Sequence, residues 1–193
     1  MRFAANSILM NRKIPIDKDL SLKAVVASDA IKMYKIIDSQ RKYLGEWLPF
    51  VQFTNKLDDS KGFIEIAIKH REMKRDYVYK ICYKDKMIGL IGTKEIDYLN
   101  RNTEIGYWLS EEHQGKGFMT KSVHALIQAL FSEVKLERIQ ICCAVGNEKS
   151  IAIPNRLGFK QEGIKRNGEW AGNLQFRDLI VFSLLRSDQQ GTT

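Results

Sequence analysis

The architecture of this chain follows from residues 103–120, which read Thr-Glu-Ile-Gly-Tyr-Trp-Leu-Ser-Glu-Glu-His-Gln-Gly-Lys-Gly-Phe-Met-Thr. The segment opens with aromatic and branched residues up to Leu109, a composition that predicts a β-strand. After Gly117, apolar residues recur at helical spacing from Met119 to Val134 and predict the buried stripe of a helix. The glycines Gly115 and Gly117 therefore lie between a strand and the first turn of a helix.

This position of the glycines favours binding of an anion. The first backbone N–H groups of a helix lack internal partners, and the helix dipole places partial positive charge at the same end. Glycine has no Cβ, so a phosphate can approach these amides closely. A plain strand-to-helix turn would contain the same glycines. Neither the Walker pattern nor the dinucleotide fingerprint fits the spacing.

The rest of the chain predicts one α+β domain over residues 1–193 with a mixed, mostly antiparallel sheet. Residues 41–51 are rich in aromatic side chains but too broken for a regular element, residues 1–17 form an irregular lead-in, and residues 187–193 form a loose polar tail. Expected strands cover residues 8–14, 20–26, 77–83, 87–97, 138–145, 159–169 and 174–185, and expected helices cover 30–38, which Ser28 and Asp29 cap, 58–75 and 147–157.

Composition indicates a soluble globular protein. Hydrophobic residues make up 44% and charged residues 28% of the 193 positions, and no apolar run has the length of a membrane span or of a signal-peptide core. We therefore expect a cytoplasmic protein without membrane contact. Three cysteines form no disulfide framework and no metal-binding spacing, so we interpret Cys142 and Cys143 as buried thiols.

The net charge of +8 indicates an anionic partner. Lys and Arg residues are scattered along the chain and are not interleaved with aromatic residues, so a nucleic-acid surface is a weak alternative. A cofactor with several phosphates, or an acidic protein substrate, explains the charge as well. Charge alone does not choose among these partners.

Two motifs resemble the GNAT superfamily of N-acetyltransferases. Gln114-x-x-Gly117-x-Met119 resembles the superfamily's Gln/Arg-x-x-Gly-x-Gly/Ala segment, although Met119 replaces the usual small residue. Asn147-x-x-Ser150, followed by Gly158-Phe159, resembles a second segment of the same superfamily. The Glu-Ile-Gly-Tyr-Trp-Leu run and a late Glu-Trp are similar to the RimJ/RimL group, whose members acetylate the N-termini of ribosomal proteins.

The resemblance implies a twisted sheet with helices on both faces and acetyl-coenzyme A as cosubstrate, with no metal. It implies Glu169 as general base, Ser150 as the group that protonates the departing thiolate, and Trp47 as part of the acceptor pocket. A backbone amide near Trp108 or Leu109 would supply the oxyanion donor if the strand splays there. The cofactor contacts that it implies are Trp108, Leu109, Gln114, Gly115, Lys116, Gly117, Phe118, Met119, Thr120, Asn147 and Ser150.

The chemistry of these residues agrees with such a transfer. An α-amine, with a pKa near 7.7–8.0, loses its proton far more readily than a lysine near 10.4, so one carboxylate suffices as the base. The plainer alternatives stay open: Glu169 as an exposed turn carboxylate, Ser150 as a solvent-facing residue of a first helical turn, and Trp47 as a core residue. We hypothesise that Pro154, which cannot donate to the Ser150 carbonyl, loosens its helix and changes how Ser150 meets the cofactor.

The sequence therefore predicts direct acetyl transfer to a primary amine, at the N-terminus of a (ribosomal) protein, by a monomer or homodimer. One alternative acceptor is a small amine such as a polyamine, an amino acid or an antibiotic. Another alternative is a coenzyme A-binding module without turnover, which the presence of Glu169 and Ser150 disfavours. An open aromatic groove would favour a peptide acceptor, and a closed acidic pocket would favour a small polycation.

Overall fold

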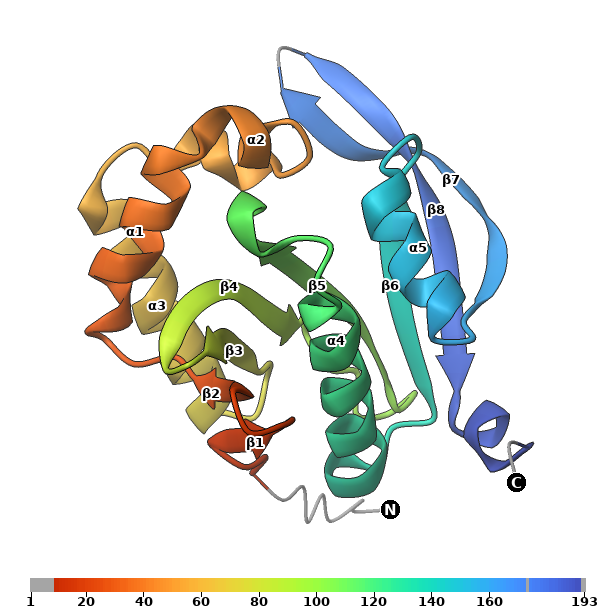
Figure 1. Ribbon diagram of the computed structural model, residues 1–193. Helices are drawn as coiled ribbons and strands as arrows, with labels where there is room; N and C mark the ends of the chain where they lie inside the picture. Colours follow the sequence, from red (N-terminus) through yellow and green to blue (C-terminus); the bar gives the residue numbers. More distant parts are fainter. Residues whose placement is uncertain (1–8, 173, 192–193) are drawn as a thin grey trace.

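The computed structural model describes residues 9–172 and 174–191. Its centre is an eight-stranded sheet in the order β1-β2-β3-β4-β5-β6-β8-β7, in which only β5 and β6 are parallel neighbours (Figure 1). This sheet confirms the predicted α+β class. The strands are β1 (Lys13–Pro15), β2 (Leu20–Ala24), β3 (Val78–Tyr83), β4 (Lys86–Thr93), β5 (Asn102–Leu109), β6 (Arg138–Ala144), β7 (Lys160–Gly172) and β8 (Gln175–Leu185).

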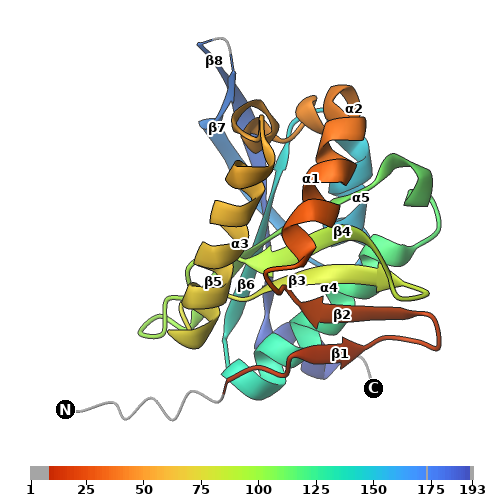
Figure 2. The ribbon, with the colours of Figure 1, turned by 90° about the vertical axis from the view of Figure 1, so that its left-hand side faces the viewer.

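Helices cover both faces of the sheet, as expected (Figures 1 and 2). The α-helices are α1 (Asp29–Ser39), α2 (Arg41–Gly45), α3 (Leu57–Glu72), α4 (Phe118–Ala129) and α5 (Glu148–Arg156). A π-helical turn, η3 (Leu130–Val134), extends α4, and three 3₁₀ helices complete the set: η1 (Pro49–Phe53), η2 (Glu111–His113) and η4 (Arg186–Gly191).

Alternation along β5 divides the core into two clusters. Ile105 and Leu109 pack with Val123 of α4, whereas Trp108 packs with Met33 of α1 and Ile64 of α3. Successive side chains of a strand point to opposite faces, so one strand joins both layers. The expected stripe along the central helix is confirmed by this packing.

The two edges of β5 differ in length of pairing. Along β4, the register runs from Ile105, opposite Thr93, to Leu109, opposite Gly89. Along β6, pairing covers only residues 102–104 opposite 138–140. The strands diverge beyond Glu104 (Figure 1), so the predicted splay is present.

Residues 41–51 contain two short elements, α2 and part of η1, which agrees with a segment too broken to be one regular element. Two other local predictions were wrong. Ser28 makes no side-chain cap; instead the buried Asp29 carboxylate accepts a hydrogen bond from the Val26 N–H group at 2.9 Å. The tail forms η4 as far as residue 191, and Asp188 in it accepts a hydrogen bond from the Leu185 N–H group at 3.0 Å.

The N-terminal expectation is tested only in part. The short strand lies at Lys13–Pro15, later than predicted, and residues 1–8 of the expected lead-in lie outside the described part of the chain. Within residues 9–172 and 174–191, none of the helices has the length and apolar character needed to cross a membrane.

Candidate active site

The pairing of β5 with β4 shows which backbone groups of β5 face the opening, where β5 and β6 diverge beyond Glu104. The Ser110 N–H group donates to the Ile88 carbonyl at 2.8 Å, and the Lys94 N–H group donates to the Glu104 carbonyl at 2.7 Å. Hydrogen bonding alternates along an antiparallel strand, so even-numbered residues bond to β4 and odd-numbered ones face β6. The Leu109 amide therefore faces the opening, whereas the Trp108 amide faces β4. Of the two predicted oxyanion donors, only Leu109 is suitably oriented.

A tyrosine from α2 holds the end of this edge. The Tyr43 hydroxyl donates to the Leu109 carbonyl at 3.2 Å, and the Gln114 side-chain amide donates to the same hydroxyl. Tyr43 thereby connects α2, the end of β5 and Gln114, the first residue of the glycine loop. Burial raises the pKa of Tyr43, which keeps this group a neutral donor.

The glycine loop has the backbone that the sequence predicts. Gly115 (φ +71°) and Gly117 (φ +75°) are left-handed, and Gly117 directly precedes α4. A Cβ at either position would have nothing within 4 Å, so the conformation rather than space demands glycine. Phe118 packs on Tyr83, with ring centroids 4.6 Å apart, and Met119 is buried, so these two side chains are committed to the fold. Only their backbone amides remain available to a phosphate.

The start of α5 is fastened to this loop. Asn147 is the predicted cap, because its side chain accepts the Ser150 N–H at 3.1 Å. Lys149 donates to the Gln114 side chain at 2.9 Å. Farther along, Arg156 donates to the Thr120 hydroxyl at 3.0 Å. Both contacts add positive charge beside amides that already favour an anion.

Ser150 lies across the opening from β5. Its hydroxyl is 3.3 Å from the hydroxyl of Tyr107 on β5 and 3.3 Å from the sulfur of Cys143 on β6. Burial raises the pKa of Cys143, which agrees with a structural thiol rather than a nucleophile. The serine hydroxyl is therefore joined to both strands that border the splay.

Glu169 is half-buried on β7 and lies opposite Arg177 on β8, with the Arg177 Nε atom 3.5 Å from its carboxylate. Burial raises the pKa of Glu169, and the positive charge of Arg177 opposes that shift. Arg177 also donates to the Glu46 carbonyl at 3.2 Å and stands over the Trp47 ring at 5.9 Å. The structure thus brings Glu169 and Trp47 together through Arg177.

Residues of η1, which follows Trp47 in the chain, contact the β7–β8 hairpin. Phe53 stacks on Trp170 with centroids 5.4 Å apart, and Gln52 donates to the Ala171 carbonyl at 3.3 Å. Gly172 (φ +98°) permits this approach, since a Cβ there would come within 2.3 Å of Gln52. These contacts fasten the end of the hairpin to η1, whereas Glu169 itself contacts Arg177, which stands over Trp47.

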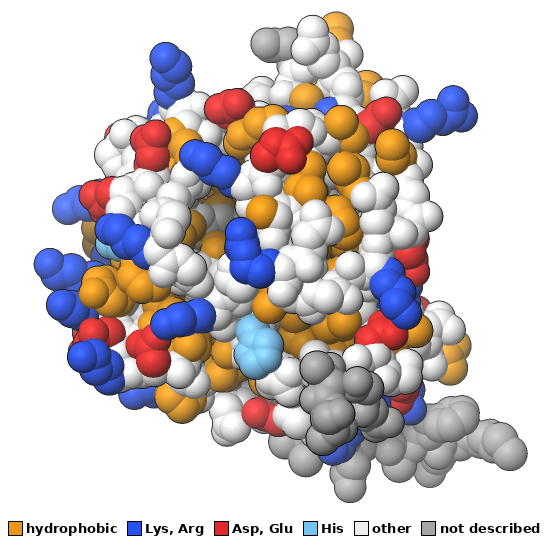
Figure 3. Space-filling view, turned by 45° about the vertical axis from the view of Figure 1, so that its right-hand side comes forward, with side chains coloured by type: hydrophobic (Ala, Val, Ile, Leu, Met, Phe, Trp, Pro, Cys, Tyr) orange, Lys and Arg blue, Asp and Glu red, His pale blue; other side chains and the backbone are white. Residues whose placement is uncertain are grey.

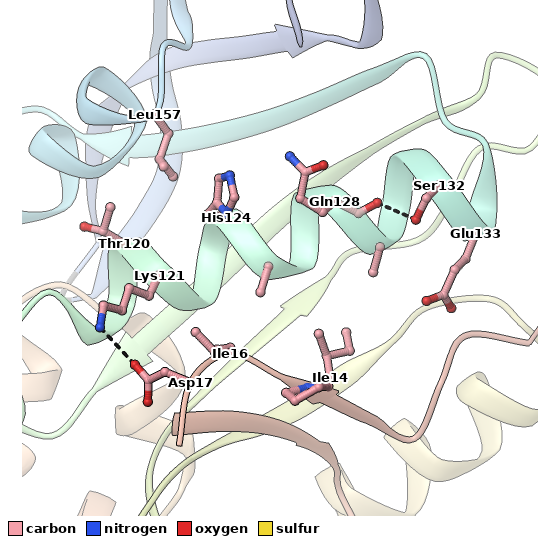
Figure 4. Close-up of a pocket in the computed structure, with 13 residues that line it drawn as sticks. Ile14, Ile16, Asp17, Thr120, Lys121, His124, Gln128, Ser132, Glu133 and Leu157 are labelled. Carbon is pink, nitrogen blue, oxygen red and sulfur yellow. Dashed lines mark hydrogen bonds and ion pairs between the residues drawn. The ribbon is translucent and has the colours of Figure 1, made fainter. Parts of the chain in front are cut away.

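A surface hollow lies away from Glu169 and Trp47. It has a volume of about 710 Å³ and runs between β1 and α4, with Asp17, His124 and Leu157 among its lining side chains (Figure 4). Lys121 and Asp17 form an ion pair at 2.9 Å across one end. On the face seen in Figure 3, Lys and Arg side chains stand apart from one another and form no continuous basic patch.

Sequence reasoning missed Tyr43, Tyr107, Lys149 and Arg177. Tyr107 belongs to the strand that was singled out, and its odd position shares a face with Leu109. Arg177 was missed because nothing in the sequence reveals its cross-strand partner. His113, beside the glycine loop, is bonded to the Ser110 hydroxyl at 2.7 Å, and burial lowers its pKa.

Comparison with known proteins supplies independent information. Residues 19–160 match the family model described as Acetyltransferase (GNAT) domain. The ribosomal-protein-serine acetyltransferase of Escherichia coli (strain K12) is 30% identical over 180 residues, which cover 93% of this chain and 100% of that protein.

Solved structures agree with this finding. The microcin C7 self-immunity acetyltransferase MccE, in complex with acetyl-CoA and AMP, has a TM-score of 0.87 at 29% identity and covers 92% of this chain and 98% of its own. RimL, a ribosomal L7/L12 alpha-N-protein acetyltransferase in complex with coenzyme A, has a TM-score of 0.86 at 25% identity, with coverage of 90% and 97%.

Proposed function

This chain belongs to the acetyltransferase (GNAT) family and uses acetyl-coenzyme A, and we propose that it acetylates the free α-amine at the N-terminus of a protein. A ribosomal protein is the proposed acceptor, because the Escherichia coli relative described as a ribosomal-protein-serine acetyltransferase matches along its entire length. The amine would attack the acetyl group directly, without a covalent enzyme intermediate.

The residues present fit acetyl-coenzyme A. Its diphosphate would be held by the amides from Gly115 to the start of α4, with Lys149 and Arg156 nearby. The amide-bearing arm of the cofactor would pair with the open edge of β5, which offers N–H and C=O groups in strand geometry. The bound cosubstrate supplies an acetyl group activated as a thioester.

Each catalytic role is assigned to one group of the chain. Glu169 accepts the proton of the amine, and burial raises its pKa towards that of an α-amine. The Leu109 amide donates to the carbonyl oxygen on which negative charge develops. Ser150 donates from its hydroxyl to the departing sulfur.

One observation carries the choice of acceptor: the charged partner of Glu169 is the cation Arg177, which also stands over the aromatic ring of Trp47. A polyamine has several positive charges and would meet Arg177 unfavourably. A peptide has one charge at its terminus, and its following residues can pack against Trp47 and the Phe53–Trp170 stack.

The test is release of free thiol from acetyl-coenzyme A with three acceptors of equal concentration. They are a peptide that begins with serine and lacks lysine, the same peptide with a blocked N-terminus and one internal lysine, and spermidine. We expect turnover on the first acceptor only, with the acetyl group located on the α-amine by mass spectrometry.

Other outcomes would reassign the acceptor. Turnover on spermidine alone would make this a small-amine acetyltransferase, and turnover on the blocked peptide would make it a lysine acetyltransferase. Tight acetyl-coenzyme A binding without turnover on any acceptor, including intact ribosomal proteins, would favour a binding module.

A further inference from the structure

The first turn of α5 contains a carbonyl whose usual helical donor is missing. In an α-helix, each residue donates its N–H to the carbonyl four positions earlier. Pro154 lies inside α5 and has no N–H group, so the Ser150 carbonyl receives no such bond from it. The helix nevertheless continues to Arg156, contrary to the simple expectation that it loosens at the proline.

A side chain from a different element reaches this carbonyl. The Tyr107 hydroxyl donates to the Ser150 carbonyl at 3.3 Å and is also 3.3 Å from the Ser150 hydroxyl. Burial raises the pKa of Tyr107 well above its ordinary value, so the phenol keeps its proton throughout the working pH range. Cys143, the third member of the group, is a buried thiol with a raised pKa and brings no competing negative charge.

We propose that Tyr107 is a positioning residue, which replaces the donor that Pro154 lacks and thereby holds the Ser150 hydroxyl towards the open edge of β5. The inference deepens the function proposed above and rests on the role of Ser150 in that function. It also revises the hypothesis drawn from Pro154: the proline changes the presentation of Ser150 by transferring one hydrogen bond from the helix to β5.

The arrangement has a mechanical consequence. A serine hydroxyl rotates freely, and it stabilises a sulfur anion only when its proton points at that atom. The Tyr107 hydroxyl lies 3.3 Å from both oxygens of the residue, so its single proton can be shared between them. This fixes the main chain and orients the side chain, while Ser150 keeps its own proton for the sulfur. No proton needs to leave the phenol. Tyr107 remains neutral, and Ser150 alone would face the cofactor.

The test is a double-mutant cycle with Tyr107→Phe and Pro154→Ala. Tyr107→Phe removes the donor and should lower kcat about tenfold, with peptide KM and acetyl-coenzyme A Kd within about threefold of wild type. Pro154→Ala restores an N–H group and should change kcat less than about threefold by itself. In the double variant, the restored helical bond should recover part of the kcat lost by Tyr107→Phe, because it replaces the contact with the Ser150 carbonyl but not the contact with the hydroxyl.

A second readout does not depend on activity. The Tm of the cofactor-free protein should fall in Tyr107→Phe, because a carbonyl loses its partner, and it should fall less when Pro154→Ala is also present. Tyr34→Phe is the matched control, since it removes a tyrosine hydrogen bond to the Asn55 carbonyl (3.2 Å) outside the site. This control should leave kcat unchanged.

The outcomes distinguish failure of the Tyr107 proposal from failure of the role of Ser150. Additive losses in both kcat and Tm would overturn the proposal, because Pro154→Ala would then not substitute for Tyr107. Full activity of Ser150→Ala would overturn the role of Ser150, and with it the catalytic part of this inference. Low activity of Ser150→Ala together with additive losses would leave the proposed function standing and remove Tyr107 from it.

Discussion

The two edges of β5 belong to one strand, but they present alternate residues and have different partners. Along β4, pairing extends to Leu109, and the even-numbered backbone groups of β5 are hydrogen-bonded to β4. Along β6, pairing stops at Glu104, and the odd-numbered groups beyond it face an opening. The closed edge contributes to the fold, and the open edge contributes to the site that we propose. On that proposal, function arises where the regular sheet is interrupted.

The largest expected effect concerns Glu169 on β7. Glu169→Gln keeps the shape of the side chain but removes the base, and it should lower kcat by about 10²-fold to 10³-fold with acetyl-coenzyme A Kd unchanged. Steady-state kinetics and calorimetry measure the two quantities.

Glu162→Gln on the same strand is the matched control. Its carboxylate is tied to Arg138 and Ser183, which lower its pKa to about 2, so it cannot serve as a base near neutral pH. We expect near wild-type kcat. Equal losses in the two variants would show that β7 carboxylates matter only for structure.

The next effect concerns Gly117, which directly precedes α4 in the glycine loop. Gly117→Ala forces a side chain into left-handed backbone at a cost of about 1 kcal/mol, and the strain should weaken acetyl-coenzyme A binding about fivefold to tenfold. Isothermal titration calorimetry provides the Kd.

Gly62→Ala is the control, because Gly62 lies within α3, its φ is not positive, and a Cβ there meets nothing within 4 Å. It should leave the Kd unchanged. If Gly117→Ala binds acetyl-coenzyme A as tightly as wild type does, the diphosphate does not use these amides.

A smaller effect is a shift in pH dependence. Glu169 must be deprotonated to act, so kcat at saturating acceptor should rise with pH through its pKa, which lies above the ordinary carboxyl value of 4.5. Arg177→Gln removes a charge that lowers this pKa, so the acidic limb should move to higher pH.

Lys94 lowers the pKa of Glu169 as well, and Glu104 raises it, so neither is changed in this experiment. Arg166→Gln, which removes an exposed charge from β7, is the control. An unchanged limb in Arg177→Gln would mean that Arg177 does not contact the working base.

The smallest effect concerns a closed part of the sheet. The folded pKa of Glu162 is lowered, so its contribution to stability is present above about 4.5 and is lost as pH falls towards about 2. Glu162→Gln should flatten this acid slope in denaturant unfolding. The change should stay below about 1 kcal/mol, because the Arg138–Glu162 pair is exposed to solvent. A larger loss would show that the pair is a main support of β7.

The sequence predicted the fold well because its signals are local. Periodicity defined the strands and the central helix, and glycines at positive φ marked the loop. The short helix α2 was missed because five residues carry too little periodicity to reveal it. Instead of a Ser28 cap, the adjacent Asp29 carboxylate accepts a local bond from the Val26 N–H group and a tertiary bond from Lys80, and no local pattern reports the second.

The candidate site was predictable only where a motif carries it. Asn147 and the glycine loop follow from local chemistry, and the splay was inferred from a family resemblance. Choosing the Leu109 amide over that of Trp108 required the register with β4. Likewise, Tyr107 and Arg177 act across strands, and such partners are defined only when the sheet has formed.

The most direct test of the open edge is amide hydrogen exchange along β5 by NMR, with and without acetyl-coenzyme A. The account predicts that the amides of Tyr107 and Leu109 exchange readily in the free protein and slow at least about tenfold when the cofactor binds. The amides of Gly106 and Trp108, already bonded to β4, should change much less. Equal slowing of odd and even amides, or none at Tyr107 and Leu109, would contradict the claim that this edge binds the cofactor.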